Sequence, residues 1–111
     1  MARSKTDLLQ GTLDLIVLQL LRAEPTNGYD LSLRIQAITK DVLNVNAGSL
    51  YPALYRLEAK GLVRAEWAAT EKGRQAKVYS LTVAGKKHLA AERDTWDRFS
   101  AALAAILRTT S

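Results

Sequence analysis

The chain contains no cysteine, one histidine and two prolines, and it has no apolar run long enough to cross a bilayer. Without cysteine it can form neither disulfides nor thiolate or cysteine–zinc sites. The apolar stretch at residues 13–21 is far shorter than the ~20 residues of a membrane-spanning helix, and it is interrupted by Asp14 and Gln19. No apolar run of the signal-peptide kind follows the basic start. We therefore expect a cytoplasmic protein without a membrane partner.

Signals of catalysis are also scarce. The single histidine, His88, lies in a basic stretch, and no serine stands in a nucleophile-elbow motif. The six glycines are scattered singly, so no glycine-rich loop is present to hold a phosphate group. The acidic residues Glu92, Asp94 and Asp97 are spread around one expected helix rather than paired across a cleft. We expect no enzyme activity, no cofactor and no metal site.

Apolar residues and an uneven positive charge are what the chain does have. Its 111 residues, 48% of them hydrophobic, are enough for one domain with a modest core. Residues 1–45 hold five basic and five acidic residues, residues 46–81 hold six and three, and residues 82–111 hold five and three. The net charge of +5 therefore lies in the last two segments. Proteins that dock on phosphates show this distribution, although many proteins with this charge bind no nucleic acid.

Residues 8–21 are apolar on almost every side, which predicts a helix that is covered over most of its surface. In a chain this small, a second subunit would supply part of that cover. The alternative is the central helix of a monomer. A turn at residues 25–28 is expected to follow, and then a second helix at residues 29–39. The residues that this second helix is expected to bury are Leu31, Ile35 and Ile38.

Residues 42–45 are short and β-branched, so they predict a small strand before the third helix. Asn46 can cap the start of that helix, and Gly61 can end it in the left-handed conformation. One helical face is apolar, with Leu50, Leu54 and Leu57. The other face is polar, planar or cationic and suits contact with something other than water. Its residues are Ser49, Pro52, Tyr55, Arg56 and Lys60.

Two strands are expected at residues 63–70 and 75–82, forming a hairpin. The alternation in the first strand places Val63, Ala65 and Trp67 on its buried face. The loop at residues 71–74 has a glycine between two cations, which suits a tip that approaches a phosphate backbone. The alternative is that these cations only keep the tip soluble.

The last helix is expected at residues 83–108, with Thr82 as its cap. Apolar residues recur along it at alternating spacings of three and four, a short coiled-coil-like seam. A long helix that extends past a small domain has little of its own chain to cover such a seam, so self-association is expected. The seam residues are Leu89, Trp96, Phe99, Leu103 and Ile106.

Three helices followed by a two-stranded hairpin predict a mainly α protein with a small β-hairpin, an α+β winged helix-turn-helix. In this fold the third helix enters the major groove, and flanking groups hold phosphates. Packing against the second helix or the wing is the alternative role for Tyr51 and Tyr55. The expected DNA-binding residues are Tyr29, Asn46, Ser49, Tyr51, Pro52, Tyr55, Arg56, Lys60, Lys72, Arg74 and Lys77.

The sequence resembles the PadR family of bacterial transcriptional regulators, in particular a short subgroup common in acidobacterial genomes. The resemblance covers residues 8–107 and is carried by the segments LQGTLD (9–14), NGYD (27–30), GSLYPAL (48–54), RLE (56–58), GLV (61–63), RAEW (64–67), KVYSLT (77–82) and AG (84–85). It implies a winged-helix DNA-binding domain at residues 1–82 and a dimerisation helix at residues 83–111 that joins the first helix. It also implies a homodimer that binds double-stranded operator DNA, usually as a repressor.

The dimer interface implied by the seam and the resemblance consists of Leu13, Ile16, Val17, Leu20, Leu89, Trp96, Phe99, Leu103, Ile106 and Leu107. Some family members respond to phenolic acids or flat hydrophobic drugs near this interface. A small aromatic effector could therefore stack on Trp96, although a tryptophan at helical spacing also serves as core. Two other functions stay open: a protein-interaction module on a winged-helix scaffold, and a ligand-sensing dimer in which DNA binding is secondary.

Overall fold

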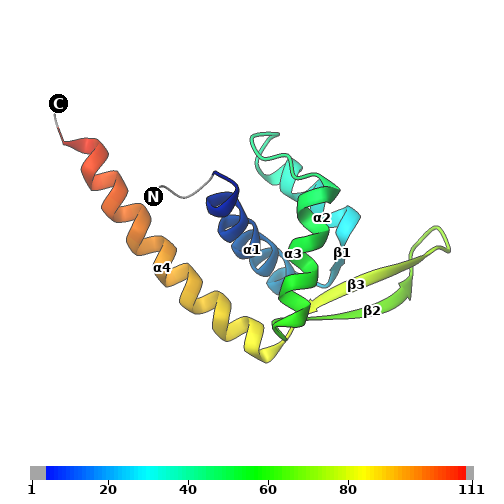
Figure 1. Cartoon of the computed structure of the whole chain (residues 1–111). Coiled ribbons are helices and arrows are strands. Elements are labelled where there is room, and N and C mark those ends of the chain that lie inside the picture. Colours follow the sequence, from blue (N-terminus) through cyan, green and yellow to red (C-terminus); the bar gives the residue numbers. More distant parts are fainter. Residues whose placement is uncertain (1–4, 110–111) are drawn as a thin grey trace.

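The structure is a computed structural model that describes the backbone of residues 5–109 and the side chains of residues 11–109. A three-helix unit carries a β-hairpin on one side and a long C-terminal helix on the other, which gives a longest axis of 58 Å (Figure 1). Among the described residues, no helix is long and apolar enough to cross a membrane. The elements are α1 (Lys5–Ala23), β1 (Thr26–Asn27), α2 (Gly28–Ile38), α3 (Ala47–Ala59), β2 (Val63–Ala69), β3 (Gln75–Leu81) and α4 (Val83–Arg108).

Helix α1 lies at the centre, between α3 and α4 (Figure 1). Its buried side chains form one core with the apolar faces of the neighbouring helices and with Tyr79 of β3. The core includes Leu13, Val17 and Leu89, three residues expected at the dimer interface. That expectation is wrong for these three, because Leu13 and Val17 of α1 and Leu89 of α4 are buried in the chain's own core. Ile16 and Leu20 are only partly buried, so their place at a dimer interface stays a prediction.

The α2 region differs from the sequence expectation in two places. Ile38 is 63% exposed instead of buried, because it is the last residue of α2 and extends beyond the core that Ile35 reaches one turn earlier. Residues 42–45 form no strand. The chain reverses at Lys40 and Asp41, both at positive φ, and the Thr39 hydroxyl accepts a hydrogen bond from the Leu43 amide at 3.1 Å. This segment therefore closes the end of α2.

A two-residue strand, β1, lies instead at Thr26–Asn27, where a turn was expected. The antiparallel sheet has the order β1-β3-β2, with Thr26 opposite Tyr79 and Val63 opposite Leu81. The expected burial alternation of β2 fails at Trp67, which is 69% exposed. Burial on this face of β2 falls from Val63 through Ala65 to Trp67, because the core covers only the start of the strand and the hairpin projects beyond the helices (Figure 1).

Both ends of α3 are formed as expected. The Asn46 side chain accepts a hydrogen bond from the Ser49 amide at 3.0 Å, and Gly61 ends the helix at φ +74°. The chain after α3 is bonded to the start of α4, since the Thr82 hydroxyl donates to the Gly61 carbonyl and accepts from the Gly85 amide. Thr82 is thus the cap of α4, as predicted, and it also joins α4 to the end of α3.

Candidate nucleic-acid interface

The outer face of α3 is open to solvent. Leu50, Leu54 and Leu57 are buried beneath it, so the helix periodicity turns the intervening side chains outward. Tyr55 is 53% exposed and is the largest of these outward side chains. The other exposed residues expected to contact DNA here are Asn46, Ser49, Pro52 and Lys60. An exposed helix face with hydroxyl, amide and ammonium groups has the chemistry needed to contact DNA in a major groove.

Tyr51 has a supporting role that sequence spacing alone left open. Its side chain is only partly exposed, because the ring lies against Gly28 at the start of α2. A methyl group added at Gly28 would lie 2.7 Å from the Tyr51 ring carbon Cε1, closer than two carbons can approach. The Tyr51 and Tyr55 rings are 6.3 Å apart. Tyr51 therefore packs α3 on α2, the alternative considered for it, while its ring neighbour Tyr55 faces solvent.

Arg56 does not lie on the outer face, so that part of the expectation is wrong. Its guanidinium Nη2 is 2.9 Å from Asp14 Oδ1 of α1, and both side chains are partly buried. The pair joins two helices whose residues are 42 positions apart in the chain. A signal for it was present in the sequence, since a carboxylate in an otherwise apolar helix needs a cationic partner when it is taken out of water.

Lys77 is also engaged within the chain rather than free for a phosphate. Its Nζ lies 3.5 Å from Glu58 Oε1 of α3 and 5.6 Å from the centre of the Tyr55 ring. The same ammonium group is 5.7 Å from the ring of Tyr79. Lys77 thus ties β3 to α3 through an ion pair with Glu58 and a cation–π contact with Tyr55.

The buried phenol of Tyr79 stays neutral at any physiological pH. Burial, together with nearby Tyr55 and Glu58, raises the pKa of Tyr79 to about 12. Because the phenolate is disfavoured, the hydroxyl remains a neutral part of the core beneath Lys77. This cluster holds the inner wing firmly at one position relative to α3.

Free cations lie at the wing tip. Lys72 and Arg74 are exposed on the loop between β2 and β3, and the loop is closed by the hydrogen bond from the Thr70 amide to the Arg74 carbonyl. Tyr29 is also exposed, at the first turn of α2. These three side chains lie outside α3, on α2 and on the loop of the wing. They occupy positions from which a helix in a groove would be held by contacts to the phosphate backbone.

Helix α4 carries an exposed apolar seam. Trp96 is 45% exposed and stacks against Phe99 at 5.7 Å between ring centres. Leu103, Ile106 and Leu107 continue the seam toward the C-terminal end of the helix, and all three are exposed. Contiguous apolar surface of this kind on an extended helix typically marks an interaction site.

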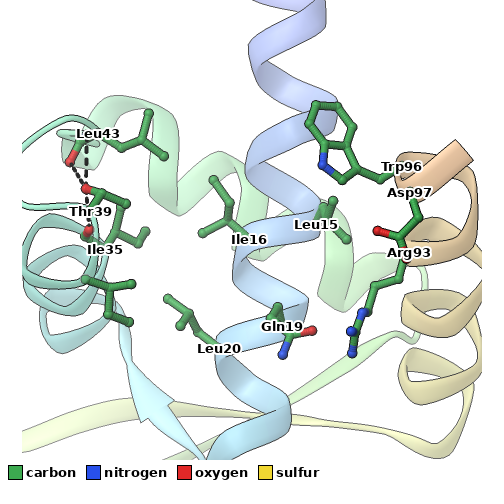
Figure 2. A pocket seen from close by; sticks show the side chains of 11 residues that line it. Leu15, Ile16, Gln19, Leu20, Ile35, Thr39, Leu43, Arg93, Trp96 and Asp97 are labelled. Atoms are coloured by element: carbon green, nitrogen blue, oxygen red, sulfur yellow. Dashed lines mark hydrogen bonds between the residues drawn. The ribbon is translucent and has the colours of Figure 1, made fainter. Parts of the chain in front are cut away.

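A pocket of about 320 Å³ lies beside Trp96, between α1, α2 and α4 (Figure 2). On the α1 side its wall is mostly apolar, with Leu15, Ile16 and Leu20 beside Gln19. On the α4 side the charged Arg93 and Asp97 lie next to Trp96. His88 lies on α4 outside this pocket, with Glu92 one turn away at 3.5 Å. No group of three or more side chains in the described part of the chain could hold a metal ion.

A helix-turn-helix unit with a β-hairpin wing behind its third helix defines the winged-helix class. The chain belongs to the PadR-like family of transcriptional regulators, whose profile it matches over residues 17–91. Members of this family are transcriptional regulators, which implies DNA binding, and not enzymes.

Individual relatives agree with this assignment. A transcriptional regulator of Mycobacterium tuberculosis is 40% identical over 58 residues, which are 52% of this chain and 53% of that protein. A PadR-family regulator from Eggerthella lenta is 31% identical and superposes with a TM-score of 0.75, covering 94% of this chain and 88% of its own. A PadR-like regulator from Bacillus cereus is 26% identical with a TM-score of 0.82, covering 94% and 99%.

Proposed function

We propose that the protein is a homodimeric, sequence-specific DNA-binding repressor. The observation that carries this proposal is the exposed polar face of α3, flanked by the free cations of the wing tip. In this proposal residues 1–82 are the DNA-binding domain, and residues 83–111 together with α1 form the dimer interface. Family membership supports the regulator function.

The proposed DNA contacts follow the exposure of each side chain. Ser49, Pro52 and Tyr55 would face the bases, because they lie on the outer side of α3. Polar and apolar contacts to base edges are what give sequence specificity. The phosphate contacts would come from Tyr29, Asn46, Lys60, Lys72 and Arg74. Tyr51 and Lys77 would act indirectly, because they hold α3 on α2 and the wing on α3.

A Lys72→Ala, Arg74→Ala variant tests the wing contact. Each phosphate contact releases counterions from DNA, so the loss of two should flatten the slope of log affinity against log salt by about two. Affinity should fall for all sequences alike, because phosphates carry no sequence information. The measurement is fluorescence anisotropy with DNA from upstream of the protein's own gene, at several salt concentrations.

An Arg98→Ala, Arg108→Ala variant is the matched control. It also removes two positive charges, from the C-terminal half of α4, a helix on the opposite side of α1 from the wing (Figure 1). Its slope should equal that of the wild type. Equal slopes for the wing variant and the wild type would contradict the wing contact. Failure of the wild type to bind any upstream DNA would favour the protein-interaction module instead.

The proposed dimer rests on the seam of α4. Trp96, Phe99 and Leu103 are each about half exposed on a helix that extends away from the three-helix unit (Figure 1). Burying such a seam against a second copy removes apolar surface from water on both chains at once. A twofold pair would also present two α3 helices to successive major grooves, which matches the symmetry of operator half-sites.

The apolar pocket beside Trp96 favours a second, additional function, the binding of a small planar aromatic effector. Its size and its few polar groups suit such a molecule (Figure 2). In a Trp67→Phe background the only remaining tryptophan is Trp96, so quenching reports on this pocket. We expect saturable quenching by at least one member of a panel of planar aromatics, including phenolic acids. An unchanged signal across the panel would contradict effector binding here.

A further inference from the structure

The ion pair between Asp14 and Arg56 connects the two helices that the proposed function assigns to different tasks. Asp14 lies on α1 and Arg56 in the last turn of α3, with 2.9 Å between Oδ1 and Nη2. The Asp14 and Arg56 side chains are 22% and 31% exposed, so water screens the pair only in part. A charged hydrogen bond of this length is among the stronger and more directional contacts available to side chains.

The residues next to Asp14 and Arg56 in the chain show which surfaces the ion pair connects. Next to Asp14 along α1, Leu15 and Ile16 line the pocket that faces α2 and α4 (Figure 2). Next to Arg56 along α3, Tyr55 faces solvent on the proposed DNA-reading side. The ion pair therefore lies between the proposed dimer and effector side of α1 and the proposed base-contacting side of α3.

The contacts that α1 and α3 make in the core are apolar. Leu54 and Leu57 of α3 pack in the core with Val17 and Leu18 of α1. Apolar contacts are not directional, so they tolerate a small rotation of α3 about its axis. Tyr51 against Gly28 restrains the N-terminal half of the helix. The Asp14–Arg56 pair restrains the C-terminal half.

From this geometry we infer that Asp14 is a positioning residue for specific DNA binding. Through Arg56 it fixes the rotation of α3 on α1, so that Ser49 and Tyr55 meet the base edges in register. This inference rests on the proposed function, and it gives Asp14 a part in specific DNA binding without direct contact to DNA. Specific binding depends on the rotation of α3, whereas non-specific binding depends on the total charge that faces the phosphates.

The sign of the charge makes the inference testable. Removal of a carboxylate raises the net charge by one, which by electrostatics alone strengthens binding to any DNA. If Arg56 itself read bases, loss of Asp14 would remove one of the contacts that hold it away from them. Both alternatives predict equal or tighter binding of an Asp14→Asn variant. A positioning role predicts weaker binding to the operator alone.

The experiment measures the DNA affinities of the Asp14→Asn variant and of the wild type. One DNA is the fragment from upstream of the gene that the wild type binds, and the other is a scrambled fragment of equal length. We expect specific affinity to fall roughly 3- to 30-fold, the range for coupled residues outside a binding surface. Affinity for the scrambled fragment should stay equal or rise. Asp14→Glu, which keeps the charge, should restore most of the specific affinity. All measurements are made well below the melting temperature of each variant.

Asp94→Asn is the matched control, since it removes one carboxylate and one ion pair, with Arg98 at 3.3 Å, on exposed α4. It should leave the ratio of specific to non-specific affinity unchanged. Equal or tighter specific binding by Asp14→Asn overturns the inference. So does an equal loss on both fragments, which would show an effect on stability only. If the wild type bound no upstream fragment, the proposed function itself would fail, a result separate from these.

Discussion

A Trp96→Ala, Leu103→Ala double variant is expected to sediment as a monomer at concentrations where the wild type is a dimer. Truncation of a buried aromatic anchor at an interface typically costs ~2 kcal/mol or more. With a second anchor lost, dimer affinity should fall by about three orders of magnitude, at ~1.4 kcal/mol for each factor of ten. Operator binding should weaken by at least about a hundredfold, because one chain contacts only one half-site.

The double variant should still fold. Trp96 and Leu103 are 45% and 43% exposed in the single chain, so their truncation opens no closed cavity in the core. Circular dichroism checks this directly. Asp94→Ala, Arg98→Ala is the matched control, with two truncations on the opposite face of the same helix. It should remain a dimer. A stable dimer of the seam variant would place the interface elsewhere.

A Gly85→Ala variant is expected to lose about 2–3 kcal/mol of unfolding free energy, although alanine normally favours a helix over glycine by ~1 kcal/mol. Gly85 is buried in the first turn of α4. A Cβ atom there would overlap the carbonyl oxygen of Leu62 and lie 2.7 Å from Leu81 Cδ1. The Leu62 carbonyl already accepts a hydrogen bond from the Thr82 amide, so the two backbone segments must separate.

The melting temperature of the Gly85→Ala variant should fall by about 10 °C or more, as measured by calorimetry. Gly11→Ala provides the opposite control, because nothing lies within 4 Å of a Cβ at Gly11 of α1. That substitution should leave the melting temperature unchanged or raise it by a few degrees. A Gly85→Ala variant as stable as Gly11→Ala would show that α4 does not need its close approach to Leu62.

Features fixed by neighbouring residues could be predicted from the sequence. The cap at Asn46, the left-handed Gly61 and the cap at Thr82 are local, since each depends on residues within one helical turn. The order of the four helices and the β-hairpin followed from periodicity, and the structure confirms the α+β winged-helix fold. The outward face of α3 was largely predictable for the same reason, because buried leucines define the opposite side.

Features that depend on distant partners could not be predicted from spacing. Arg56 and Lys77 were expected to face DNA, yet tertiary contacts hold them against Asp14 and Glu58. Thr26 forms a strand only because Tyr79 of β3 lies opposite it. A helical wheel gives the direction of a side chain but not the residue it meets. For the same reason, the sequence could not separate the α1 residues that serve the core from those left for a partner.

Hydroxyl-radical footprinting of the upstream DNA tests the central claim most directly, that two copies present α3 to successive major grooves. We predict two related protected segments whose centres lie about one helical turn apart, ~10 base pairs, or a multiple of it. Protection should saturate at two chains for each DNA site. A single protected segment saturated by one chain, or protection without sequence preference at any salt concentration, would contradict the account.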